Sequence, residues 1–181
     1  MELRTRQVGP WSMNTYALVC PHTNQSVLID PGDDPDTLSD MLAGTTPIAI
    51  LLTHTHGDHI GALDEMRGRL GVPLGAFDGP HIGGMLLNEE IKFKDDDGFI
   101  VGNHALRVIH TPGHIDDQVC FAVVGDNKVI VGDTIFDGGP GKTWSADGFR
   151  RTLATLRVVL GWPDDAICYP GHGPHFRLGD R

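Results

Sequence analysis

The sequence predicts an α+β fold in which two β-sheets pack face to face and helices cover their outer sides. Three observations predict it. Short runs of β-forming residues come in pairs joined by polar or glycine-containing turns, which is typical of hairpins. One run, Ile48–Thr53, is apolar throughout, like a strand buried on both faces. Three other segments space their apolar residues as helices do, and helices outside two packed sheets would cover those strands.

The first half of the chain alternates strands with short helices. In chain order we expect strands at 15–20 and 26–30, a helix at 36–42, a strand at 48–53, a helix at 63–70 and a strand at 73–77. The turn P-H-T-N-Q joins the first two strands as a hairpin, and P-G-D-D-P then breaks the sheet. Gly71 ends the second helix, and Pro73 prevents its continuation. Residues 78–97 are expected to form a loop with one helical turn.

The second half repeats this plan. We expect hairpins at 99–101 with 105–110 and at 119–124 with 128–131, a helix at 149–160, and a last strand at 166–169. The helix is indicated by the spacing of Phe149, Leu153, Leu156 and Leu160. No linker, low-complexity tract or sharp repeat divides the chain. The sequence therefore predicts a single domain over residues 1–181.

Composition narrows the classes of partner and compartment. The formal net charge of −10 repels phosphate backbones, so no nucleic-acid partner is expected. Three separated cysteines in apolar contexts indicate reduced, buried thiols. The N-terminus M-E-L-R-T-R-Q-V has no apolar signal core, and no stretch is long enough to span a membrane. We expect a cytoplasmic protein with a small-molecule substrate and no membrane partner. The sequence is also compatible with a homo-oligomer.

The segment T-H-T-H-G-D-H directly after the apolar run carries the chemistry. His54 and His56 would project to one side of an extended loop, because the side-chain period of extended chain is two. Asp58 and His59 follow the turn at Gly57 and would face a neighbouring point. Histidine and carboxylate without cysteine form a nitrogen–oxygen ligand set that suits zinc, iron or manganese. One short segment can thus supply ligands to two metal ions.

Three further turns at strand ends carry residues of the same type. T-P-G-H presents His114, V-G-D-T presents Asp133 and Y-P-G-H-G presents His172. Each follows an apolar run and lies beside glycine, as functional loops at one edge of a sheet do. Together with the histidine-rich segment, these turns predict a metal site.

These motifs resemble the metallo-β-lactamase-fold superfamily, most closely its hydroxyacylglutathione hydrolase (glyoxalase II-like) branch. The resemblance covers nearly the whole chain through N-T-Y-A-L-V, L-I-D-P-G, T-H-T-H-G-D-H, T-P-G-H, G-D-T-I-F and P-G-H-G. It implies a four-layer αββα sandwich made of two mixed sheets flanked by helices. It also implies a site for two divalent metal ions, with zinc expected and iron or manganese as alternatives.

The resemblance further implies a role for each candidate ligand. The first metal would be held by His54, His56, His114 and Asp133, and the second by Asp58, His59, Asp133 and His172, with Asp133 bridging. A hydroxide shared by the two ions would attack a thioester or ester carbonyl, with Asp58 both ligating and orienting it. Enzymes of the main zinc β-lactamase classes carry cysteine or no ligand at the bridging position. Antibiotic hydrolysis is therefore not expected.

The chain departs from the glyoxalase II branch in three places. Lys142 and Trp144 occupy the positions of a lysine and a tyrosine that hold glutathione, and indole can only donate a hydrogen bond. T-P-G-H is followed by I-D-D-Q, where the branch usually has threonine and then a small residue. The sequence given ends nine residues after His172, without the helical domain that completes the glutathione site. We therefore expect Lys142 and Trp144 to contact substrate in a more open pocket.

Three other functions are compatible with these motifs. A persulfide dioxygenase-like enzyme would use a single iron held by His54, His114 and Asp133. A lactonase or another hydrolase of the superfamily would differ mainly in pocket shape. A non-catalytic metal-binding protein would be marked by the loss of a ligand residue, yet all seven are present. Metal content and the preferred substrate separate these functions.

Overall fold

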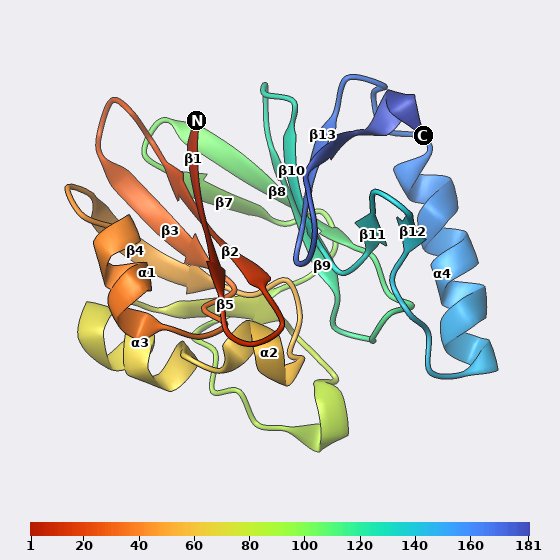
Figure 1. Ribbon diagram of the computed structural model, residues 1–181, viewed down its shortest axis with the longest axis horizontal. Helices are drawn as coiled ribbons and strands as arrows, with labels where there is room; N and C mark the ends of the chain where they lie inside the picture. The colour runs from red at the N-terminus through yellow and green to blue at the C-terminus, as the bar shows by residue number, and fades with distance from the viewer.

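The computed structural model describes residues 1–181 and contains two six-stranded sheets packed face to face (Figure 1). The first sheet, in spatial order, consists of β1 (Glu2–Val8), β2 (Met13–Val19), β3 (Gln25–Ile29), β4 (Thr46–Leu51), β5 (Leu74–Phe77) and β6 (Ile91–Phe93). The second runs β14 (Phe176–Arg177), β13 (Ile167–Pro170), β10 (Lys128–Gly132), β9 (Val119–Val123), β8 (His104–His110) and β7 (Gly98–Val101). Both sheets mix parallel and antiparallel pairs.

Helices form the two outer layers. The helices are α1 (Pro35–Met41), α2 (Gly57–Ile60), α3 (Leu63–Leu70) and α4 (Ala146–Val159), with single 3₁₀ turns η1 (Ile82–Gly84) and η2 (Leu178–Asp180) and a small ribbon β11 (Ile135–Phe136) and β12 (Gly139–Pro140). In Figure 1, α1 and α3 lie on the side of the first sheet, and α4 lies on the opposite side of the molecule, beyond the second sheet. The predicted αββα sandwich is confirmed. No helix is long and apolar enough to span a membrane.

Strand alternation divides the apolar residues among three buried clusters. On β2, Ala17 faces the cluster beneath α1 and α3, whereas Leu18 faces the central cluster between the sheets. The central cluster draws on both sheets, for example Ile29 of β3 and Phe121 of β9. The third cluster lies between the second sheet and α4, where Val159 is fully buried. The β-strands of the middle layers are therefore covered on both faces, as the apolar run at 48–53 predicted.

Helix α4 turns an unexpected face inward. Its buried residues are Thr152, Thr155 and Val159, whereas Phe149 and Leu160 of the apolar stripe are 53% and 76% exposed. The physical reason is close approach. Thr155 Oγ1 donates a hydrogen bond to Pro112 O at 2.7 Å, and a Cβ at position 113 would collide with the Thr152 backbone. Small threonines let the helix sit directly against the turn that leads to His114.

Most of the predicted elements are confirmed within one to three residues at their ends. The sequence did not predict the following elements: β1, β6, the four-residue helix α2, the β11–β12 ribbon and β14. The expectation that 78–97 forms only a loop with one helical turn is wrong at 91–93, where β6 pairs with β5. Strands β1 and β6 are the two edges of their sheet. A short or polar edge strand carries little apolar periodicity, so its pairing is decided by its neighbour rather than by its own sequence.

Candidate metal centre

The strand order brings the predicted residues to one edge of the sandwich. Strands β3 and β4 are parallel, as are β10 and β13, so their carboxyl ends lie side by side. The segment His54–His59 follows β4, Asp133 follows β10, and His172 follows β13. His114 follows β8 on a turn that α4 supports from outside. Polar side chains gathered at carboxyl strand ends are the usual arrangement of functional sites in such sheets.

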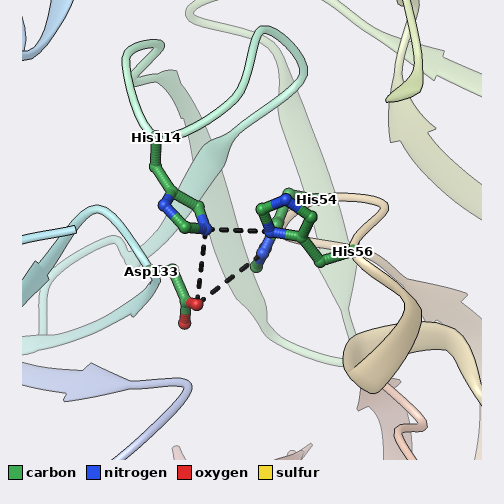
Figure 2. Close-up of side chains that lie close together, drawn as sticks. All are labelled: His54, His56, His114 and Asp133. Atoms are coloured by element: carbon green, nitrogen blue, oxygen red, sulfur yellow. Dashed lines mark hydrogen bonds and ion pairs between the residues drawn. The ribbon is translucent and has the colours of Figure 1, made fainter. Parts of the chain in front are cut away.

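One group of ligand-like side chains comprises His54, His56, His114 and Asp133 (Figure 2). Nε2 of His114 lies 2.9 Å from Nδ1 of His56 and 3.5 Å from Oδ2 of Asp133. Nε2 of His54 lies 3.9 Å from the same carboxylate oxygen. The four side chains converge on one point from three loops, as Figure 2 shows.

A second group comprises Asp58, His59 and His172. Nε2 of His172 lies 2.9 Å from Oδ2 of Asp58, and Nε2 of His59 lies 3.8 Å from that oxygen. Asp133 touches this group too, because its Oδ1 is 3.4 Å from Nε2 of His59 and its Oδ2 is 3.8 Å from Nε2 of His172. Asp133 is therefore the one carboxylate shared by both groups, and all seven predicted ligand residues meet at one place.

The histidines are oriented by hydrogen bonds on their other ring nitrogen. Nδ1 of His59 contacts Asp30 Oδ2 at 2.9 Å, and Nδ1 of His114 donates to the Lys142 carbonyl at 2.7 Å. Nδ1 of His54 contacts Thr53 Oγ1 at 2.9 Å. These bonds leave each Nε2 directed at the shared point. Metal-bound histidines are held in the same way in other proteins.

The donor atoms at this point fit divalent cations. Nε2 of His54, Nε2 of His59 and Oδ1 of Asp133 are buried and have no hydrogen-bond partner. Burying such atoms unpaired costs about 1–3 kcal/mol each, more for a charged group. Three orphaned polar atoms aimed at one small region are satisfied together if cations lie among them. Nitrogen and carboxylate donors without thiolate suit zinc, iron or manganese.

Burial and neighbouring charges set the protonation of the two groups differently. Burial and then the charge of His59 keep the pKa of His54 well below its usual value, and burial and His114 lower that of His56. Burial also opposes the charge on His59, but the nearby carboxylates of Asp133, 3.4 Å away, and Asp30, which is hydrogen-bonded to it, outweigh burial and raise the pKa of His59 to about 10. Contact with His172 lowers the pKa of Asp58 to about 2. The first group is thus ready to bind a cation, whereas the second holds a proton.

This difference predicts unequal proton release on metal binding. At pH 8, a cation at the second group must displace about one proton from His59, because the pKa of His59 is about 10 and the pH lies below it. His54 and His56, with lowered pKa values, have no proton to lose. Titration calorimetry in buffers of different ionisation enthalpy should show that protons are released in only one of the two metal-binding steps. Equal release in both steps would contradict the assignment.

A cavity of 690 Å³ opens above the metal-binding residues. Lys142 and Trp144, predicted as substrate contacts, both line it, together with Trp11 and Phe136. Nζ of Lys142 lies 4.3 Å from the centre of the Trp144 ring, in a cation–π contact. The Trp144 ring lies 6.1 Å from that of His56. The two predicted substrate residues therefore stand at the rim of the cavity that contains the ligand set.

Sequence reasoning missed several residues that shape the site. Asp30 accepts from the Thr53 amide at 2.7 Å and from Thr53 Oγ1 at 2.6 Å while it holds His59. The sequence position of Asp30 could have indicated this role, because an acidic residue directly after a buried strand is unusual unless it has partners. Trp11 lies in the cavity wall and accepts at its carbonyl from Nδ1 of His172 at 3.2 Å. No local pattern marks that contact, because 161 positions separate the two residues.

The sequence profile of the family described as "Metallo-beta-lactamase superfamily" matches residues 8–172, which include both ligand groups. The chain belongs to this superfamily. The predicted recognition is confirmed.

Curated relatives within the metallo-beta-lactamase superfamily include hydrolases. "Probable metallo-hydrolase YqgX" of Bacillus subtilis (strain 168) is 34% identical, over 96% of this chain and 91% of that protein. "Probable hydroxyacylglutathione hydrolase glo2" of Schizosaccharomyces pombe (strain 972 / ATCC 24843) is 30% identical, over 91% of this chain but 65% of the relative. The chain thus spans nearly all of the first protein and about two thirds of the second. These names support the general class of metallo-hydrolase.

Solved structures of the superfamily agree with the fold and with metal binding. The "BLEG-1 B3 metallo-beta-lactamase" has a TM-score of 0.86 and 28% identity, and the match covers 98% of this chain and 95% of that chain. "TTHA1623 in a di-iron-bound form" has a TM-score of 0.82 and 30% identity, covering 97% and 95% respectively. The histidine and aspartate groups of this chain support a divalent metal site of the superfamily type.

Proposed function

We propose that the protein is a hydrolase with a binuclear metal site that cleaves a thioester or ester of a small organic molecule. The observation that carries this proposal is the sharing of Asp133 by two ligand groups at the base of an open cavity. Zinc is the expected ion in both positions, with iron or manganese as alternatives. A substrate of ordinary metabolite size fits a cavity of 690 Å³.

Seven side chains would hold the two ions. One ion would be bound by His54, His56, His114 and Asp133, and the other by Asp58, His59, His172 and the same aspartate. Two divalent ions in such a site lower the pKa of water toward neutrality and stabilise the negative charge that develops on a carbonyl oxygen. No separate protein nucleophile is required by this reaction class.

Asp58 has the properties of a residue that orients water. Contact with His172 keeps its pKa at about 2, so it is a carboxylate throughout the neutral range. It lines the cavity, and its side chain retains 26% exposure, unlike the fully buried His59. A carboxylate at this position accepts a hydrogen bond from a water molecule and so points a lone pair of that water at the substrate carbonyl.

Lys142 supports a substrate that bears an anionic group. Its ammonium forms no ion pair with any acidic side chain, and it lines the cavity beside exposed Trp144. An unpaired ammonium on an aromatic face attracts a carboxylate while the indole packs against the carbon chain of the substrate. Trp144 can donate but not accept a hydrogen bond, which distinguishes this rim from one built with tyrosine.

The test combines metal analysis with a substrate panel. Purified protein should contain two zinc ions per chain, and it should hydrolyse a carboxylate-bearing thioester faster than an uncharged ester, a lactone or a β-lactam. Asp58→Ala should reduce kcat by more than about 100-fold, whereas Asp40→Ala on α1 should leave kcat unchanged. Negligible turnover of every thioester and ester, with both metals bound, would refute the proposal.

Metal analysis and the substrate panel also distinguish the hydrolase from a second candidate function, a mononuclear iron dioxygenase. His54, His114 and Asp133 form part of the first group and constitute two histidines and one carboxylate, the usual ligand set of mononuclear iron oxygenases. One iron per chain, with oxygen consumption in the presence of a persulfide, would show that the protein is a dioxygenase and not a hydrolase. Metal bound with no turnover of either kind would indicate a non-catalytic metal-binding protein.

A further inference from the structure

The unusual I-D-D-Q that follows T-P-G-H has a structural consequence beside the metal centre. Asp117 is buried, with 2% exposure. Its Oδ2 accepts a hydrogen bond from Thr55 Oγ1 at 2.5 Å and contacts Nδ1 of His81 at 2.8 Å. Its Oδ1 is buried without any partner. The carboxylate therefore depends entirely on Thr55 and His81 for its hydrogen bonds.

Thr55 is the residue between His54 and His56. It is 1% exposed, and its hydroxyl also accepts a hydrogen bond from the Ile82 amide at 3.3 Å. Thr55 is thus held from two directions by residues far away in the sequence. Because a single peptide unit joins it to each neighbouring histidine, the position of Thr55 restricts the directions of both imidazoles.

His81 completes the network on the other side. Its Nε2 lies 3.5 Å from Oε1 of Glu89, and the side chains of both residues are more than nine-tenths buried. Lys92 reaches the same glutamate oxygen at 3.9 Å. The imidazole of His81 therefore lies between two buried carboxylates, with one ring nitrogen directed at each of them. The network therefore fastens the loop around η1 to the segment that carries two metal-ligand histidines.

We propose that Asp117 is a positioning residue of the metal centre, which holds Thr55 and thereby aims His54 and His56, while His81 holds Asp117 in place. The inference rests on the proposed metal site but not on its substrate. It also gives the loop 78–90 a role, since the network couples that loop to metal binding. Buried outer partners of metal ligands usually change affinity by about 10–100-fold when removed.

A matched pair of substitutions at Thr55 tests the proposal. Thr55→Val keeps the shape and removes the hydroxyl, whereas Thr55→Ser retains the hydroxyl. The valine variant, loaded with Co²⁺, should show a shifted d–d absorption spectrum and about tenfold weaker metal affinity in chelator competition. The serine variant should restore both. Thr45→Val, which removes a hydroxyl bonded to Leu42 O at the opposite end of β4, is the control.

A double variant distinguishes positioning through Asp117 from a general loss of stability. If Asp117 acts through Thr55, then Asp117→Ala combined with Thr55→Val should weaken metal affinity little more than either change alone. Additive losses would show that the two residues act separately and would overturn the proposal. So would a valine variant with the wild-type spectrum and affinity.

The wild-type protein offers a measurement that needs no variant. Because coupling is reciprocal, metal binding should slow hydrogen exchange of the Ile82 amide, which donates to Thr55. Unchanged exchange would overturn the coupling. Metal binding without hydrolysis would refute the proposed function and leave this inference standing, since none of its measurements uses turnover. A chain that binds no metal at all would refute both.

Discussion

Asp133→Asn is expected to release both metals and to lower kcat/KM by more than about 10³-fold. Both oxygens of this carboxylate are used, since Oδ1 faces His59 at 3.4 Å while Oδ2 faces His114 at 3.5 Å and His172 at 3.8 Å. An amide has one oxygen and no charge, so it cannot serve two cations. The amide would also place a nitrogen and its hydrogens against one group of imidazoles. Among the predicted ligands, Asp133 is the one carboxylate that contacts histidines of both groups.

The measurement is metal content after gel filtration, together with hydrolysis of the best substrate. Asp165→Asn, which changes an exposed aspartate at a separate surface cavity, is the matched control and should behave as wild type. Loss of one metal with the other retained at full affinity would show that Asp133 does not bridge. Full activity in Asp133→Asn would rule out the binuclear mechanism altogether.

Gly171→Ala is expected to destroy the centre without touching a ligand. A Cβ at this position would collide with Oδ1 of Asp133 and would lie 2.5 Å from Cε1 of His59. The backbone cannot move away, because the Gly171 amide donates to Gly132 O at 2.9 Å and its carbonyl accepts from the Asn14 amide at 2.7 Å. Inserting a methyl group into such a packed region costs about 1–3 kcal/mol. The strain falls on the side chains of Asp133 and His59.

Chelator competition should therefore show metal affinity at least about 100-fold below wild type, and thermal denaturation should show a lower transition. Gly68→Ala is the control, because nothing lies within 4 Å of a Cβ at that position in α3. A helix interior favours alanine over glycine by about 0.5–1 kcal/mol, so that variant should be slightly more stable. Wild-type metal affinity in Gly171→Ala would show that the region relaxes and that the close approach is not needed.

Much of the fold follows from local pattern. The strand 48–53, the helix ended by Gly71 and the three hairpins each carry their own apolar period or turn residues, and each is present. Elements whose stability comes from a neighbour were missed. Strand β1 is mostly exposed, β6 has three residues, and both exist because an adjacent strand offers them hydrogen bonds.

Helix α4 shows how tertiary contacts override an apolar stripe. The spacing of Phe149, Leu153, Leu156 and Leu160 correctly predicted a helix, yet all of them except the half-buried Leu156 are exposed. The buried face consists of Thr152, Thr155 and Val159, and it carries Thr152 where the helix approaches Gly113 closely, because only a small side chain permits that distance. Periodicity reports that a helix forms, but the shape of the surface beneath decides which side is buried.

Residue types and short spacings along the chain were enough to predict the long elements and the candidate ligands, and the resemblance of the motifs implied the superfamily and the bridging role of Asp133. The hydrogen bonds by which Asp30 orients His59 and Asp117 joins Thr55 to His81 became visible only in the folded chain. The hydrogen bonds of Asp30 and Asp117 span 29 positions to His59, 62 to Thr55 and 36 to His81. Strand order and strand register bring such distant residues together, and neither can be predicted from a local sequence pattern.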